Sequence, residues 1–400
     1  AAIRVAGDRV AIDTFEIDVA GGRVTVQGDA SEALDLNVVV SRLPLSIANL
    51  VRADLGLGGT LEGEARVRGS RSEPQATFSM RGSALQASGL EAAGISTMDA
   101  ALSGSFANQT VTLTSASANS PQGLTLTASG AIPLSGNGLS VNLNGSAPLS
   151  LANRFLADRG TQITGIVEVN GSVSGSLQSP SIRGMFSTSG AQLVDPDSNL
   201  RLSAINIMGA MDGETVTIRT ANAALASGGS VSASGNVSIN ADAGFPADIR
   251  IQLNQARYAD GDMVVATVSG NLAVGGALAR DPQISGELNV ERAEIAVPDN
   301  FGGSAASLDV IHKNAPAGVR ETLVRARAND GTPVPSSRPS VLRLNVGINA
   351  PARIFVRGRG LDAELGGRVQ LTGPVTDIQP VGGFTLIRGR IGILGQRITF

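Results

Sequence analysis

A strand pattern that occurs four times constrains the fold of this chain more than any other feature. The copies start at Leu61, Val167, Val268 and Leu365, and in each copy small or apolar residues alternate with mostly polar residues over eight positions. Because successive side chains of a β-strand point to opposite faces, this alternation predicts one apolar or small face and one polar face. Each copy is therefore expected to form a half-buried strand.

The residues that follow each copy repeat as well. A glycine ends each copy and a proline follows after a variable gap, and the prolines are 106, 102 and 98 residues apart. Glycine at the end of a strand, followed by a proline that cannot donate to a sheet ladder, indicates a turn. A second alternating run begins beyond each proline, so the unit is strand, turn, strand. The pairs are Gly69 and Pro74, Gly175 and Pro180, Gly276 and Pro282, and Gly373 and Pro380.

The composition agrees with an all-β fold. Fifty glycines and only 16% charged residues disfavour helices and suit many short strands with tight turns. The long repeat favours one continuous array over residues 1–400, with approximate repeats at 1–147, 148–249, 250–345 and 346–400. The chain ends inside a strand-like run at Phe400, so we interpret it as part of a longer protein.

The apolar strand faces must be hidden, which limits the architecture. About 12 residues per strand and turn would give roughly 30 strands, too many for a single small barrel. The prediction is an elongated, curled β-sheet that forms a groove, a repeating β-groove or β-taco, with a few short plug helices.

Two short segments predict those plug helices. Residues 44–54 and 148–158 are identical at seven of eleven positions at an offset of 104, which indicates internal duplication. Ser46 could cap the first helix, and Ile47, Leu50 and Val51 would share one face. A binding role for these helices is the alternative, but packing of the apolar stripe onto the end of the strand face is favoured.

The residues of the chain do not assemble a catalytic or metal-binding motif. There is no cysteine, and the one histidine, His312, lies in a loop-like segment over about 298–339 that predicts a flexible insertion. Residues 195–199 resemble the start of a calcium loop, but Leu200 replaces the expected glycine and Asn206 the expected glutamate. We therefore expect a protein that is not an enzyme and uses neither metal nor cofactor.

The charge of the chain argues against a nucleic-acid partner. The net charge is only −3, whereas nucleic-acid binding needs a strong positive balance. Residues 320–400 differ, with twelve arginines against five acidic residues. This basic excess could favour anionic groups nearby or could be a solvated surface.

The expected groove lining suggests a hydrocarbon ligand. Aromatic residues make up only 3% and tryptophan is absent, so the lining would be aliphatic and smooth. Acyl chains of phospholipids match such a surface, and each buried methylene contributes about 0.8 kcal/mol. The predicted lining residues are Leu61, Val67, Met80, Val167, Val173, Phe186, Val268, Val274, Leu288, Leu365, Leu371, Phe384 and Leu386.

Residues 357–367 and 383–398 resemble the C-terminal domain of the TamB family, the translocation and assembly module subunits, which is similar to AsmA-like and bridge-like lipid-transfer proteins. The resemblance implies a periplasmic protein of Gram-negative bacteria, held in the inner membrane by an N-terminal segment that this chain lacks. It also implies a β-groove, an outer-membrane barrel partner (TamA), and phospholipid transport in outer-membrane biogenesis.

Two other functions stay open at this point. The first is a chaperone that assembles outer-membrane β-barrel proteins and autotransporters, which the family's older link to protein secretion also implies; it would pair peptides along a free sheet edge. The second is a structural β-solenoid adhesin, although that class typically shows repeats of about 20 residues rather than about 100.

Overall fold

The computed structural model describes residues 2–6, 9–50, 55–92, 94–156, 160–196, 198–240, 242–260, 263–297, 342–393 and 396–400. The predicted insertion at about 298–339, with His312, lies outside these residues. The chain divides into two compact units. Unit 1 comprises Ala1–Asn240 and Ile249–Ala256, and unit 2 comprises Ala241–Asp248 and Arg257–Phe400.

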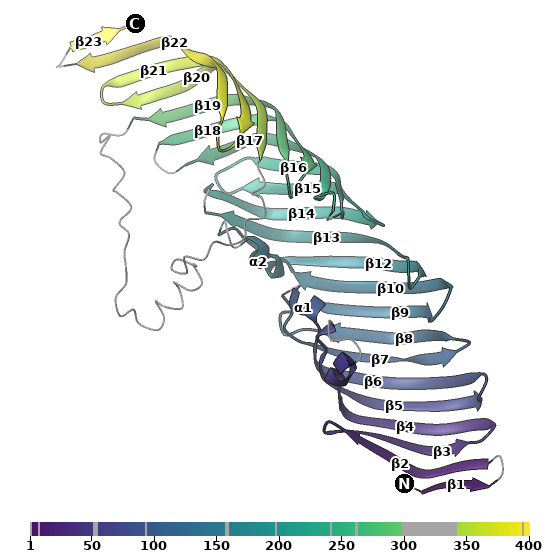
Figure 1. Ribbon diagram of the computed structural model, residues 1–400. Helices are drawn as coiled ribbons and strands as arrows, with labels where there is room; N and C mark the ends of the chain where they lie inside the picture. The colour runs from purple at the N-terminus through teal and green to yellow at the C-terminus, as the bar shows by residue number, and fades with distance from the viewer. Residues whose placement is uncertain are drawn as a thin grey trace, which may run out of the picture. The chain divides into compact units, whose positions relative to one another are not determined.

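Unit 1 is a ladder of antiparallel strands in chain order (Figure 1). Each strand pairs with the strand before it, except that β10 pairs with β12, and the short β11 pairs with β13. The strands are β1 (Ala2–Ala6), β2 (Arg9–Val19), β3 (Gly22–Ala30), β4 (Ala33–Pro44), β5 (Gly58–Ser70), β6 (Pro74–Gln86), β7 (Met98–Ala107), β8 (Thr110–Asn119), β9 (Thr125–Pro133), β10 (Asn137–Pro148), β11 (Gln162–Thr164), β12 (Ile166–Ser176), β13 (Pro180–Asp195), β14 (Leu200–Asp212), β15 (Thr215–Leu225) and β16 (Ser230–Ser238).

Unit 2 is antiparallel apart from one pair. Its β19 and β20 run parallel, and residues 298–341 connect the end of the first strand to the start of the second. Parallel strands need a long crossover because the chain must travel back along the strand. The strands are β18 (Val264–Ala277), β19 (Gln283–Ala296), β20 (Arg343–Gly358), β21 (Leu361–Pro374), β22 (Gln379–Ile393) and β23 (Gln396–Thr399), and the residues of β17 (Pro246–Ala259) are divided between the two units.

The helices are short and lie at one end of the strands of unit 1, as Figure 1 shows for α1 and α2. They are η1 (Leu45–Leu50), α1 (Ser88–Ala92), η3 (Leu149–Ala152) and α2 (Asn153–Leu156). Among the described residues, no helix has the length and apolar character that a membrane crossing requires. The predicted all-β class, with an open curled sheet and short helices, is confirmed.

The duplicated helical segments are present, but their predicted capping is wrong. Ser46 lies inside the 3-10 helix η1, and η3 starts after Pro148 without a side-chain cap. Leu50 is 87% exposed, so it does not pack onto the sheet with Ile47. The 3-10 helix starts at Leu45, directly after the end of β4 at Pro44. Ser46 is therefore already helical, whereas an N-cap residue has extended backbone and precedes the helix.

An asparagine repeated in both segments holds the following loop. The amide of Asn49 donates to the carbonyl of Leu57 and accepts from the backbone N–H of Leu57, both at 2.8 Å. Asn153 accepts from the backbone N–H of Ile163 at 2.7 Å. The two asparagines occupy equivalent positions at the offset of 104, so the duplication preserves this contact.

Bulges interrupt several of the long strands in both units. Register shifts interrupt pairing between Val40 and Leu43 in β4, and the same occurs in β6, β14 and β20. A bulge inserts an unpaired residue and bends its strand. The unpaired residues have positive φ although none is glycine: Arg42 (47°), Ala84 (49°), Ala204 (48°) and Arg353 (70°).

Burial is concentrated beside these bends. In unit 1, Ala191 is fully buried next to a bulge of β13, and in unit 2 Ala350 is fully buried and packs with Ile354 and Ala293. No large side chain among the described residues is fully buried. The core of each unit is therefore a narrow strip beside the bends, and much of the sheet is left half-exposed.

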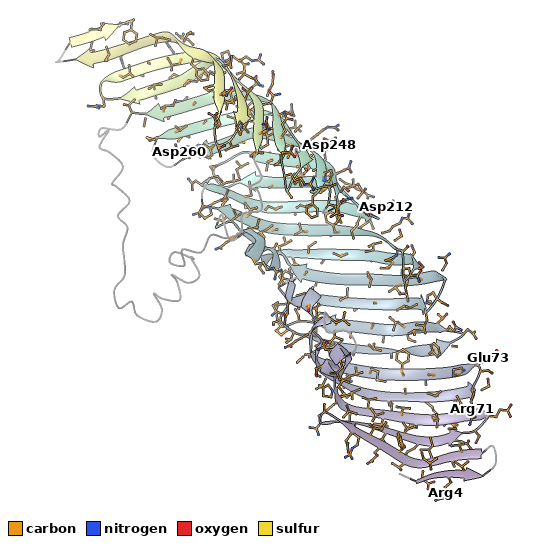
Figure 2. All side chains as sticks on the ribbon, in the orientation of Figure 1. Arg4, Arg71, Glu73, Asp212, Asp248 and Asp260 are labelled. Atoms are coloured by element: carbon orange, nitrogen blue, oxygen red, sulfur yellow. The ribbon has the colours of Figure 1, made fainter. Side chains whose placement is uncertain are left out.

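The opposite strand ends carry charged turns. Figure 2 places Arg71, Glu73 and Asp212 at these ends, away from the helices of unit 1. The Nε atom of Arg71 donates to the carbonyl oxygens of Ala30 and Ser31 at 3.1 and 3.0 Å. This contact ties the β5–β6 turn to the β3–β4 turn, so neighbouring hairpins are held together at their tips.

Candidate functional site

The apolar sheet face is the candidate site, and the repeated strands show how it arises. In β5 the apolar parity, from Leu61 to Val67, is half-buried, whereas Glu62, Glu64, Arg66 and Arg68 are exposed. The four predicted copies lie on β5, β12, β18 and β21. We call the sheet side of Leu61 and its cross-strand partners the apolar face, and the other side the polar face.

Cross-strand register joins the apolar residues of unit 1 into rows without a polar residue. One row from β2 to β13 reads Phe15, Val26, Val38, Ala65, Phe78, Gly104, Leu113, Gly130, Val141, Val173 and Ile182. Another from β4 to β16 reads Leu43, Leu61, Gly82, Ala100, Ala118, Leu126, Gly145, Val169, Phe186, Gly209, Ile218 and Gly235. Directly opposed residues share a face, so these rows form one apolar surface.

Unit 2 has rows of the same kind. One reads Leu272, Gly286, Val346, Leu371 and Pro380, and another reads Ala266, Ala293, Ile354, Leu365 and Leu386. The parallel step between β19 and β20 keeps apolar residues opposite apolar residues. Each unit by itself therefore presents a continuous apolar face.

The predicted lining residues all lie on the apolar face of their own unit. Within unit 1, Leu61 and Val67 come from β5, Met80 from β6, and the remaining three from β12 and β13; all are half-buried. In unit 2, Leu365 and Leu386 are directly opposed. Phe384 and Leu386 are more exposed, at 39% and 44%, because β23 does not extend beside them. Among the predicted lining residues of the second, third and fourth strand copies and the strands paired with them, the half-buried ones are Val167, Val173, Phe186, Val268, Val274, Leu288, Leu365 and Leu371.

Several lining residues were missed by the sequence analysis. Leu139 and Val141 of β10 are buried on the apolar face, as are Ala350 and Ile354 of β20. The alternation of Leu139, Val141 and Leu143 was visible in the sequence, but β10 carries no copy of the repeated motif. Opposition to Val173 in the neighbouring strand is what places Val141 in the lining.

Aromatic rings lie flat on the apolar face because glycines lie opposite them. A Cβ atom added to Gly209 would be 2.2 Å from Cζ of Phe186, and one added to Gly104 would be 2.9 Å from Cζ of Phe78. The rings therefore occupy the space that a side chain would fill in the adjacent strand. These two rings therefore lie along the sheet, over the glycines of the adjacent strands.

One polar side chain in the apolar face is internally satisfied. Thr188 is opposed to Val167 and Ile207, and its hydroxyl donates to the carbonyl of Ile166 at 2.7 Å. A buried hydroxyl with a partner carries little penalty. The face therefore offers dispersion contacts and water exclusion rather than hydrogen bonds to a ligand.

These features define a class of protein: an open β-groove, formed by a curled amphipathic sheet with one continuous aliphatic face that is only partly buried. Residues 219–399 match the model of the TamB C-terminal domain, and this part of the chain, from β15 to β23, belongs to the TamB family. The TamB family is linked to outer-membrane assembly or lipid transport. No curated protein and no solved structure matches the chain.

Proposed function

We propose that the chain is a periplasmic lipid-transfer conduit that carries phospholipid between inner and outer membranes with the acyl chains against its apolar face. The continuity of the apolar rows is the observation that supports this most. An acyl chain can move along these rows without meeting a polar side chain, and each methylene removed from water contributes about 0.8 kcal/mol at every position.

The partial exposure of the lining also supports a ligand. Leu126 and Val169 are opposed to the same residue, Gly145, and remain 38% and 39% exposed on the apolar face. A protein that filled its own groove would bury residues at such central positions. The proposal includes no catalysis, and it includes the inner-membrane anchor and the outer-membrane partner TamA that the family resemblance implies.

Charged substitutions on the two faces test the conduit. Val173→Arg, Val274→Arg or Leu371→Arg puts a guanidinium among aliphatic side chains, and we expect at least a tenfold loss of phospholipid recovered with the purified protein by mass spectrometry. Arg66→Glu is the matched control because Arg66 lies on the polar face, where it pairs with Asp35 at 3.2 Å. Equal losses from both faces, or wild-type protein free of lipid, would contradict the proposal.

The outer edge of β22 favours a second candidate function, the assembly of outer-membrane β-barrel strands. Within the described residues, β23 covers only residues 390–393, so the edge over residues 379–388 has no ladder partner. Val381 is 65% exposed and Ile387 is 49% exposed on this strand. A long apolar edge strand is a template for pairing with an extended peptide.

A crosslinking experiment separates this function from lipid transfer. A photo-crosslinker at Val381 should capture an unfolded outer-membrane protein, whereas one at Arg68 of β5 should not, because β5 is paired on both sides. Capture at both positions alike would argue against edge pairing. Retention of capture in Val173→Arg would show that the two activities are independent.

A further inference from the structure

Arginines gather on the polar face of unit 2, on the opposite side of the sheet from the groove. Cross-strand register places Arg357 opposite Asp362 and Asp362 opposite Arg390. The adjacent row places Phe355 opposite Glu364 and Glu364 opposite Arg388. Three guanidinium groups from β20 and β22 therefore flank two carboxylates of β21.

The two carboxylates hold the guanidinium groups in place. Asp362 accepts from Nε of Arg357 at 3.1 Å and from Nη2 of Arg390 at 2.8 Å. Glu364 accepts from Nε of Arg388 at 2.6 Å, and its other oxygen accepts from the backbone N–H of Arg353 at 3.2 Å. Glu364 itself is buried, so it is a fixed anchor for a guanidinium that is exposed.

The cluster keeps positive charge and hydrogen-bond donors in excess. Hydrogen bonding from Arg388 lowers the pKa of Glu364, and hydrogen bonding from Arg357 and then Arg390 lowers the pKa of Asp362, so both are ionised at neutral pH. Three guanidiniums against two carboxylates leave one net positive charge. Each guanidinium carries five N–H donors, and the ion pairs engage only some of them.

These side chains surround a hollow. It has a volume of about 380 Å³ and is lined by Phe355, Arg357, Asp362, Glu364, Arg388, Gly389, Arg390 and Thr399. The guanidinium carbons of Arg292 and Arg357 lie 5.1 and 4.9 Å from the centre of the Phe355 ring, within cation–π range. The ring and the carboxylates thus orient the arginines before any ligand arrives.

We propose that this hollow binds a phosphate group, as a phosphate monoester, a phosphodiester or inorganic phosphate. Guanidinium pairs match phosphate oxygens in bidentate geometry, and the Thr399 hydroxyl adds a further donor at the hollow. A tetrahedral phosphate can accept from three guanidiniums at once, which a planar carboxylate cannot do as fully. The site is separate from the proposed conduit because the sheet lies between them.

Equilibrium dialysis of the full chain against radiolabelled inorganic phosphate tests the site. We expect Arg388→Gln combined with Arg390→Gln to weaken phosphate binding at least tenfold. Arg388→Lys combined with Arg390→Lys keeps the charge but loses the bidentate fork, so we expect a smaller loss. Arg66→Gln removes an arginine of the same kind, on the polar face of unit 1, and should leave phosphate binding unchanged.

Two results would overturn the site: undiminished phosphate binding in the double glutamine variant, or an equal loss in Arg66→Gln. Thermal melts of the lysine variant check that the fold persists when the arginines are replaced. Flotation with phosphatidylglycerol or phosphatidylcholine vesicles identifies the source. Retention by either vesicle that the glutamine variant abolishes points to a lipid headgroup, whereas phosphate binding without vesicle retention points to a soluble phosphate compound.

Discussion

At the scale of single residues, the repeated glycines act through their backbone conformation. Gly69, Gly175, Gly276 and Gly373 have φ values of 96°, 101°, 89° and 97°. Side-chain-bearing residues avoid this region because Cβ meets the backbone, and a Cβ atom at Gly175 would lie 2.8 Å from the carbonyl oxygen of Ser179. The four glycines that end the repeated strands therefore occur in the sequence because the turns require positive φ at these positions.

Alanine at one of these turns should weaken the adjacent hairpin. We expect Gly175→Ala to cost about 1–3 kcal/mol, the typical price of a strained backbone, measured as faster amide hydrogen exchange in β12 and β13. Gly383→Ala is the control, because Gly383 has ordinary φ and open space at its Cβ position. Equal effects of both substitutions would rule out backbone strain as the cause.

Glu364 gives a residue-scale prediction for pH. Its folded-state pKa lies below the ordinary value of 4.5, mainly because Arg388 donates to the carboxylate. A depressed pKa adds stability that is complete well above pH 4.5 and is lost as the pH falls through the folded-state value. We therefore expect Glu364→Gln to lower the melting temperature at pH 7, by an amount that shrinks steadily toward strongly acidic pH. A difference independent of pH would contradict this assignment.

At the scale of elements, the repeated asparagines fix the loops that follow the helical turns. Asn153→Ala leaves the N–H of Ile163 without its partner, and a lost hydrogen bond of this kind costs about 0.5–1.5 kcal/mol. We expect faster exchange of the Ile163 amide and no change at Leu57, which the equivalent Asn49 holds. Asn49→Ala should give the reverse pattern, and a loss of protection at both loops in either variant would contradict local action.

The strands and their turns could be predicted from sequence because each depends on residues close in the chain. The alternation of Leu61 to Val67 and the Gly69–Pro74 turn are such local signals. The bulges could not be predicted: Arg42, Ala84 and Arg353 adopt positive φ without being glycine, because pairing with neighbouring strands forces the bend.

Ser46 shows the limit of motif reasoning within an element. Its position before an apolar stripe matched a helix cap, yet the chain enters a 3-10 turn one residue earlier. The arginine site was also incomplete in the sequence, which showed only an excess of arginine. The register between β20, β21 and β22 brings Arg357, Arg388 and Arg390 to one hollow. That register could not be predicted from the sequence of this region.

At the scale of the whole molecule, each unit is built mainly from contacts between neighbouring strands, and its described residues form only a narrow buried strip. In unit 1 a strand contacts the strands beside it, so stability is a sum of local terms, as in repeat proteins. Val141→Arg should therefore speed hydrogen exchange in β9, β10 and β12 and leave β3 and β4 protected. A uniform loss across unit 1 would show that the unit unfolds cooperatively instead.

The parallel pair β19–β20 has a consequence for how such an array can be lengthened. Strict up-and-down order would reverse the direction of β21 relative to β18, since two strands separate them, and would send the Gly373 turn to the other rim of the sheet. Running β20 alongside β19 cancels that reversal, so Gly276 and Gly373 end their strands at the same rim. The parallel pair thus allows a block with an odd number of strands to be inserted while the strand copy that follows keeps its direction.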